Sequence, residues 1–230
     1  MKRESRKKRN AQTPQENTGE KPVLIRTENG LTLTDSRQTM TGDFSSLLSR
    51  ISENNLRGEL LVKASKIRGL DRPVRVTDAT AGMGEDSFLL AAAGFQVKLY
   101  ERDPVIAALL RDALERAALD PDLASVVSRM EFFEEDSLQA MRRCSQPPDV
   151  ILLDPMFPER KKSGLIKKKF QLLQQLEQPC SDEEELMEAA ISAHPRKIVV
   201  KRPLKGPWLA GRKPHYSLKG KAIRYDCFVL

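Results

Sequence analysis

The sequence predicts an α/β fold built on a mostly parallel, doubly wound sheet, with an antiparallel hairpin at its C-terminal edge. From residue 73 onward, short apolar stretches alternate with longer amphipathic ones, a pattern typical of parallel strands joined by helices. At the C-terminus, "HYSLKGKAIRYDCFVL" contains two strand-like runs around Lys219-Gly220, which predicts the hairpin.

The elements of the main domain follow in a regular order. Gly94 predicts the end of the first helix, Pro104 fits the first turn of the second, and Ser181 caps the third. The expected strands cover residues 73–80, 95–101, 129–136, 149–154 and 196–202, and the expected helices cover 85–94, 104–118 and 181–194.

The residues before this domain divide into two parts. Residues 1–21 contain almost no apolar side chains, which predicts a disordered basic tail. Residues 22–70 are expected to form a small N-terminal extension, made of a hairpin around Asn29-Gly30 and one helix. The helix is predicted from the spacing of four apolar residues, with a cap at Asn54 or Asn55 and a stop at Gly69: Leu56, Leu60, Ala64 and Ile67. Residues 71–230 are expected to form the main domain.

Composition narrows the class of protein. No run of about 18 apolar residues occurs and no apolar segment follows the charged N-terminus, so we expect a soluble, cytoplasmic protein. The three cysteines lie far apart and only two histidines are present, which argues against a disulfide framework and against a metal site. A chain of this length fits one main domain, and we expect a monomer.

The positive charge is concentrated in two segments. Residues 1–9 hold six Lys/Arg and one Glu, and residues 160–169 hold six Lys/Arg and no acid, so the remainder of this +7 chain is net negative. Two basic segments on an otherwise roughly neutral body favour a polyanionic partner such as RNA or DNA. The alternative for the first segment is a solvated tail without a partner.

The first strand ends in a glycine-rich turn, Asp78-Ala-Thr-Ala-Gly82-Met-Gly84, followed by Glu85 and Asp86. A dinucleotide-binding motif would have Gly or Ala where Ser87 stands, and a pyrophosphate would meet both carboxylates. A cationic ligand fits better, and S-adenosylmethionine carries an ammonium and a sulfonium. The alternative is that both acids only favour the N-terminus of the helix.

The next two strands also end in acids. Glu101 lies 17 residues after Gly84, where a carboxylate can accept hydrogen bonds from ribose hydroxyls. The third strand ends in Asp136-Ser137, which suit an adenine amino group and ring nitrogen. Asp136 could equally cap the helix that follows it.

The fourth strand ends in "DPMFP", which places Asp154, Pro155 and Phe157 directly after a buried strand. This resembles the Asp/Asn-Pro-Pro-Tyr/Phe signature of methyltransferases acting on conjugated amino groups. The Asp154 carboxylate and the Pro155 carbonyl can accept the two amino hydrogens, and Phe157 can stack on a base. The alternative is an ordinary turn with Phe157 in the core.

Cations follow the last two of these strand ends. A positive segment beside an amino-group site favours a nucleic-acid substrate, although an amphipathic surface segment would look similar. The predicted RNA-binding residues are Arg160, Lys161, Lys162, Lys167, Lys168, Lys169, Lys201 and Arg202.

Three segments together resemble one family: "DATAGMGEDSFLLAAAGFQVKLYERDPVIAALLRDAL", "LLDPMFPERKKSGLIKKK" and "IVVKRP". The chain is similar over roughly residues 56–230 to the bacterial small-subunit ribosomal RNA guanine-N2 methyltransferase J family. The resemblance implies a Rossmann-like class I methyltransferase fold for residues 71–230, S-adenosylmethionine as cofactor, and ribosomal RNA or the small ribosomal subunit as partner. It also implies cofactor contacts at Glu85, Asp86, Glu101, Arg102, Asp136, Ser137 and Asp154. From the glycine-rich turn itself we expect further cofactor contacts at Asp78, Gly82 and Gly84.

Two other functions remain open at this point. The Asp-Pro-x-Phe motif also serves methyltransferases that act on another nucleic acid base or on a protein amide. A non-catalytic RNA-binding ribosome-assembly factor could keep the same fold without turnover.

Overall fold

The main sheet has seven strands in the order β6-β5-β4-β7-β8-β10-β9. The computed structural model describes residues 22–35, 38–155 and 183–230. The strands from β4 to β8 run parallel, whereas β10 is antiparallel to both β8 and β9. Their bounds are β4 Arg75–Asp78, β5 Gln96–Glu101, β6 Met130–Glu134, β7 Val150–Leu153, β8 Lys197–Pro203, β9 Tyr216–Lys219 and β10 Ile223–Val229.

The strand order reverses beside β4. From β4 the chain moves outward through β5 to β6, then returns to the other side of β4 with β7 and continues to β8. Such a reversal opens a crevice at the carboxyl ends of the two central strands, which is where open α/β sheets bind their ligands. The site is therefore expected at the ends of β4 and β7.

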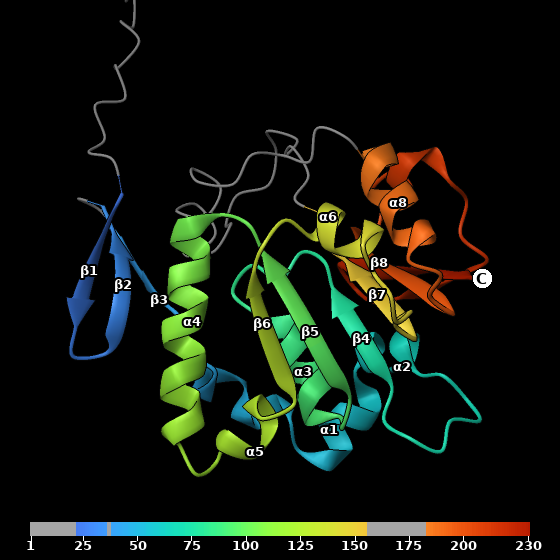
Figure 1. Ribbon diagram of the computed structural model, residues 1–230. Coiled ribbons are helices and arrows are strands. Elements are labelled where there is room, and N and C mark those ends of the chain that lie inside the picture. The colour runs from blue at the N-terminus through green and yellow to red at the C-terminus, as the bar shows by residue number, and fades with distance from the viewer. Residues whose placement is uncertain (1–21, 36–37, 156–182) are drawn as a thin grey trace, which may run out of the picture.

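Helices cover both faces of the sheet (Figure 1). On one face, Val150 and Leu152 share a core cluster with α2, α3 and α4, whereas Ile151 and Leu153 contribute to a second cluster with α6 and α8. This alternation explains why β7 is apolar at every position. The helix bounds are α2 Leu60–Ser65, α3 Glu85–Ala92, α4 Pro104–Leu119, α5 Ala124–Val127, α6 Ser137–Arg142 and α8 Glu183–Ser192, and a short 3-10 turn spans Leu209–Gly211.

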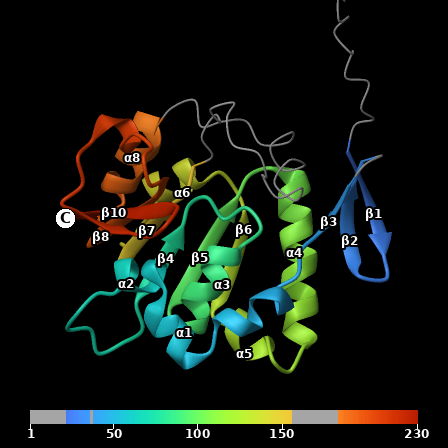
Figure 2. The ribbon, with the colours of Figure 1, turned by 180° about the vertical axis from the view of Figure 1, so that it is seen from behind.

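The predicted N-terminal hairpin is part of a separate three-stranded sheet of β1 (Val23–Thr27), β2 (Gly30–Thr34) and β3 (Thr39–Thr41). The third strand was not predicted, because three residues carry too little pattern. This sheet lies against α4, at the end of the molecule opposite α8 (Figure 2). The Asp112 carboxylate on α4 accepts a hydrogen bond from the Leu31 amide at 2.9 Å, which fixes the hairpin to the helix.

The predicted single helix between Asn54 and Gly69 is wrong. A 3-10 turn (Ser45–Arg50) leads into two short helices, α1 (Glu53–Gly58) and α2, and the backbone of Glu59 between them is extended. The amide of Glu59 donates to the carbonyls of Asn55 and Leu56 and so closes α1. Because of this break, Leu61 and Val62 turn into the core of the main sheet.

The predicted fold class is confirmed. All five parallel strands, the C-terminal hairpin, α3 and α4 lie where the sequence placed them, and α4 begins at Pro104 behind an Asp103 cap. Ser181, the predicted cap of α8, lies outside the described residues. No helix in the described part of the chain is long and apolar enough to cross a membrane.

Candidate active site

The turn between β4 and α3 takes a tight path that depends on its glycines. Gly82 has φ of 50° and Gly84 has φ of 73°, in the left-handed region that side chains with a Cβ disfavour. The Gly84 amide donates to the Ala81 carbonyl at 2.8 Å, and the Ala81 amide donates to Tyr100 on β5 at 3.1 Å. The turn is therefore pinned between α3 and the neighbouring strand.

Replacing Gly84 with alanine is expected to destabilise the protein by about 1 to 3 kcal/mol. A Cβ at this position would lie 2.8 Å from Leu110 Cδ1 and 3.4 Å from the Phe44 ring, in addition to the strained φ. Gly58→Ala is the matched control, because a Cβ there meets nothing within 4 Å. Urea unfolding of both variants measures the difference; equal stabilities would contradict the argument.

Glu101 holds the same turn from the end of β5. Its carboxylate accepts hydrogen bonds from the Gly82 amide at 3.0 Å and the Asp103 amide at 2.8 Å, and the residue is 9% exposed. Burial raises the pKa of Glu101 while these amides lower it, with a net rise. Glu101 thus lies beside the glycine turn, where the sequence predicted it.

Asp78 is buried at the end of β4 and is bonded to Ser87. The Ser87 hydroxyl donates to Asp78 Oδ2 at 2.6 Å, and the Thr80 amide donates to Oδ1 at 3.1 Å. Ser87 is the residue that breaks the dinucleotide-binding pattern, and its hydroxyl has this structural role instead. Burial, together with the nearby carboxylates of Asp86 and Asp154, raises the pKa of Asp78 to about 7.

The raised pKa of Asp78 predicts a pH-dependent stability. Because the folded state binds this proton more tightly than the unfolded chain, the stabilisation is full below about pH 4 and is lost as the pH rises through 7. From about pH 5 to 8, the wild type should lose about 2 to 3 kcal/mol of unfolding free energy relative to Asp78→Asn. Denaturant titrations at both pH values measure this; parallel pH dependences would contradict it.

Asp136, Arg102 and Ser137 meet near the ends of β5 and β6. Asp136 caps α6 by accepting the Leu138 amide at 2.9 Å, as the alternative interpretation of the sequence allowed. Its other oxygen lies 3.9 Å from the Arg102 guanidinium, whose side chain is 63% exposed. Ser137 is half-buried at the first position of α6.

Asp154 lies at the reversal point between β7 and β4. Its amide donates to the Thr80 hydroxyl at 2.6 Å, which joins the end of β7 to the turn after β4. The side chain is 37% exposed, and Pro155 behind it is buried. Asp154 therefore presents a carboxylate beside the glycine turn.

Lys201 on β8 bridges two of the predicted acids. Its ammonium lies 2.6 Å from Asp86 Oδ2 and 2.9 Å from Asp154 Oδ2. Burial lowers the pKa of Lys201, but the two carboxylates raise it more, so the side chain stays charged. Glu85, which the sequence grouped with Asp86, is exposed. The two adjacent acids therefore have different surroundings.

The prediction that Arg202 contacts RNA is wrong. The residue is 1% exposed, its Nε donates to the Pro207 carbonyl at 2.8 Å, and its guanidinium pairs with Glu183 at 3.4 Å. Along a strand, successive side chains point to opposite faces, so Arg202 turns into the interior when Lys201 faces the site. Apart from Lys201, the other predicted RNA-binding cations lie outside the described residues, as does Phe157.

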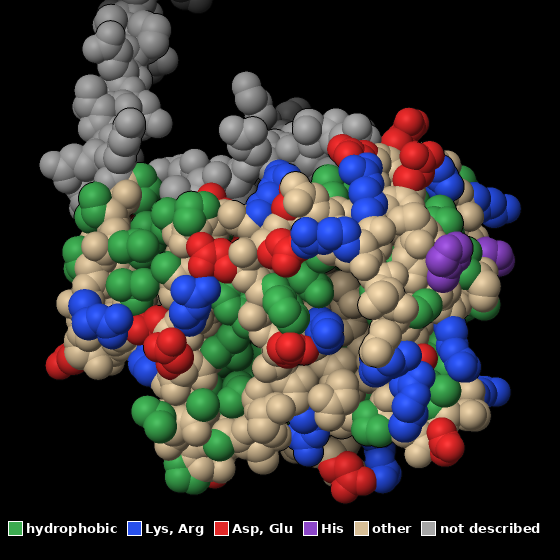
Figure 3. Space-filling model, viewed as in Figure 1, with side chains coloured by type: hydrophobic (Ala, Val, Ile, Leu, Met, Phe, Trp, Pro, Cys, Tyr) green, Lys and Arg blue, Asp and Glu red, His purple; other side chains and the backbone are tan. Residues whose placement is uncertain are grey.

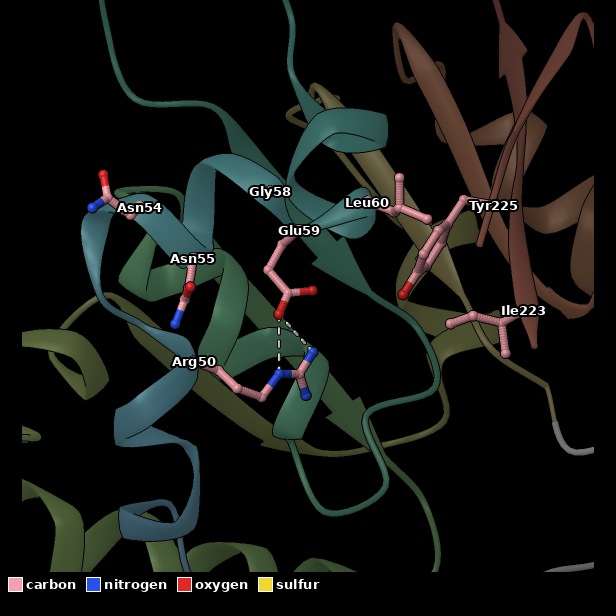
Figure 4. Close-up of a pocket in the computed structure, with 8 residues that line it drawn as sticks. All are labelled: Arg50, Asn54, Asn55, Gly58, Glu59, Leu60, Ile223 and Tyr225. Atoms are coloured by element: carbon pink, nitrogen blue, oxygen red, sulfur yellow. Dashed lines mark hydrogen bonds and ion pairs between the residues drawn. The ribbon is translucent and has the colours of Figure 1, made fainter. Parts of the chain in front are cut away.

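An open pocket of about 400 Å³ lies between the N-terminal helices and β10. In Figure 4, Leu60, Ile223 and Tyr225 border one side, and the opposite side is polar. Tyr225 is 5% exposed and lies opposite Lys201 in the antiparallel register of β10 and β8. Burial and the Asp86 carboxylate raise the pKa of Tyr225. The polar side is formed by Arg50, Asn54, Asn55 and Glu59.

The described surface carries mixed charge. On the face in Figure 3, Lys and Arg side chains are interspersed with Asp and Glu. The described residues hold no group of three or more His, Cys, Asp or Glu arranged to bind a metal ion.

The sequence did not indicate the roles of Thr80 and Tyr225 or the bridging position of Lys201. The position of Lys201 near the carboxyl end of a predicted parallel strand could have placed it close to the site, because such strand ends meet at one edge of the sheet. No pattern in the sequence could have placed Tyr225 there, because its position opposite Lys201 depends on the register of β10.

Comparisons with known proteins show the family to which this chain belongs. A family model described as "Putative SAM-dependent methyltransferase" matches residues 8–230. The ribosomal RNA small subunit methyltransferase J of Thioalkalivibrio sulfidiphilus is 43% identical over 223 residues, which cover 93% of this chain and 87% of the relative. The protein of the same name from Stutzerimonas stutzeri is 46% identical over 172 residues, 74% of this chain and 66% of that protein's length.

Solved structures of methyltransferases are similar to this chain. The crystal structure of a SAM-dependent methyltransferase from Neisseria gonorrhoeae has a TM-score of 0.73 at 29% identity, covering 94% of this chain and 86% of that one. The rRNA methyltransferase aviRa from Streptomyces viridochromogenes shares the fold, with a TM-score of 0.52 at 17% identity over 77% of this chain and 85% of that one. The chain therefore belongs to the S-adenosylmethionine-dependent methyltransferases and, among them, to the ribosomal RNA small subunit methyltransferase J family.

Proposed function

We propose that this methyltransferase modifies the exocyclic N2 amino group of a guanine in small-subunit ribosomal RNA. The observation that carries the proposal is the position of Asp154, whose carboxylate lies at the reversal point of the sheet and whose amide is bonded to Thr80 in the turn after β4. The names of the relatives, ribosomal RNA small subunit methyltransferase J, support ribosomal RNA as the substrate.

The described residues suit the cofactor of this family. Glu101 places a buried carboxylate beside the glycine turn, where it can accept hydrogen bonds from ribose hydroxyls. Asp136 and Ser137 lie at the next strand end, within reach of an adenine edge in the proposed arrangement, and Arg102 lies beside them. S-adenosylmethionine supplies a methyl group on a positively charged sulfur.

The proposed chemistry is mostly positioning. The lone pair of an aromatic amine is delocalised, so the nitrogen is a poor nucleophile. The Asp154 carboxylate and the Pro155 carbonyl accept the two amino hydrogens and aim the lone pair at the methyl group. As the N–C bond forms and the C–S bond breaks, Asp154 takes up the proton that the nitrogen releases and passes it to water.

The remaining parts of the proposal concern RNA binding. A base within a duplex must leave its stack to reach Asp154, and Phe157 is proposed to stack on it. The cations between Arg160 and Lys169 are proposed to contact phosphates. We further propose a monomer that needs no metal ion; activity that survives a chelator would support the second point.

Methyl transfer to defined substrates tests the function. Labelled S-adenosylmethionine is incubated with unmodified small ribosomal subunits, naked ribosomal RNA and bulk protein, and the products are digested for nucleoside mass spectrometry. N2-methylguanosine is the expected product, and the comparison of subunits with naked RNA identifies the form of the substrate. Label in adenine or protein would overturn the proposed specificity. No label in any sample, despite cofactor binding, would favour an assembly factor.

A further inference from the structure

The Lys201 ammonium lies within a cluster of carboxylates. Three carboxylates lie close together: Asp78 at the end of β4, Asp154 directly after β7, and Asp86 in the first turn of α3. Like charges at this range oppose one another's ionisation. The Lys201 ammonium lies within 2.9 Å of both Asp86 and Asp154 and is only 24% exposed. It is thus placed to neutralise the cluster from within, and an RNA phosphate would have to compete with two carboxylates for it.

We propose that Lys201 is a positioning residue for methyl transfer, whose ammonium holds the Asp154 carboxylate ionised and oriented to accept the amino hydrogens of the target base. The proposal rests on the function proposed above. It replaces the sequence-based hypothesis that Lys201 binds RNA.

The geometry explains why the bridge fixes a direction. Asp154 is tied on its backbone side by the Thr80 hydroxyl at 2.6 Å and on its side-chain side by Lys201. Lys201 is in turn held by Asp86 on α3 and lies opposite Tyr225 on β10. With one oxygen held by Lys201, the carboxylate keeps a fixed orientation, and its other oxygen can accept a hydrogen bond from the amino group of the base.

The charges around Asp154 give the proposal a specific signature. The pKa of Asp154 is raised overall, mainly by burial. The Lys201 and Arg202 cations lower this pKa, whereas the Asp86 carboxylate raises it further. Asp78 and Tyr225 are the other titratable groups that face this cluster. A protonated Asp154 would turn a hydrogen toward the amine instead of accepting one. Loss of Lys201 should therefore move the acidic limb of the activity profile to higher pH, and loss of Asp86 should move it to lower pH.

The test is the pH profile of kcat for three variants at saturating RNA and cofactor, from about pH 5 to about pH 9. Lys201→Met is expected to lower kcat at neutral pH by about 10- to 100-fold, with partial recovery at high pH. The KM for RNA and its salt dependence should stay close to the wild type. Lys201→Arg, which keeps the charge, should retain more activity than Lys201→Met.

Asp86→Asn supplies the opposite shift and keeps the test usable if Lys201→Met does not fold. Lys219→Met removes an exposed cation from β9 and serves as the matched control, with an unchanged profile. Unshifted profiles in the Lys201 and Asp86 variants would overturn the proposal. So would a loss in Lys201→Met that lies wholly in the KM for RNA, because that result assigns Lys201 to phosphate binding. Failure of the wild type to form N2-methylguanosine would instead refute the proposed function.

Discussion

Replacing Asp154 with alanine is expected to reduce kcat by about 10²- to 10⁴-fold, the range seen when a positioned proton acceptor is lost. The variant removes the carboxylate at the reversal point of the sheet, together with its 2.9 Å contact to Lys201. Cofactor affinity should be largely kept, because Glu101 and Asp136 lie at other strand ends. Single-turnover methylation and cofactor titration measure the two effects separately.

Two further variants make the Asp154 result specific. Asp154→Asn keeps the shape and one acceptor oxygen but loses the charge, so its rate should lie between those of the wild type and the alanine variant. Asp122→Ala removes an exposed carboxylate between α4 and α5 and should leave the rate unchanged. An undiminished rate in Asp154→Ala would refute the proposed role of this residue.

Replacing Arg224 with methionine is expected to destabilise the protein by about 3 to 5 kcal/mol, the usual cost of breaking a buried ion pair from one side. Arg224 Nε lies 2.9 Å from Asp226, and the two side chains are 6% and 2% exposed. Nη1 also donates to three carbonyls at the end of β8 and in the loop that follows it, those of Pro203, Leu204 and Gly206. The variant therefore leaves one buried charge and several acceptors without this donor.

Urea unfolding of Arg224→Met and two comparison variants tests this expectation. Arg57→Met breaks an exposed pair with Glu53 on α1 and should change stability by less than about 0.5 kcal/mol. The double variant Arg224→Met with Asp226→Leu should regain part of the loss, because neither charge of this pair is then left buried without its partner. A single variant as stable as Arg57→Met would show that the Arg224 pair contributes little.

Local patterns predicted most of the main domain correctly for physical reasons. β7 and the first part of β8 are buried on both faces, so their apolar residues run together and are visible in the sequence, whereas β5 alternates buried and exposed positions. Pro104, Gly94 and the run around Lys219-Gly220 mark element ends through backbone geometry, which is a local property. The helix break at Glu59 was missed because the apolar spacing on either side of it still fits one helix.

The sequence by itself determined the α/β class, the order of the strands along the chain, and which strand ends carry acids. Those features depend on neighbouring residues, and the carboxyl ends of parallel strands necessarily share one edge of the sheet. Only the tertiary structure decided that Lys201 joins Asp86 to Asp154 across more than forty residues of chain, that Arg202 turns inward, and that Tyr225 lies opposite Lys201. Each of these depends on strand register and on which face a side chain takes, and no local pattern encodes either for a single charged residue.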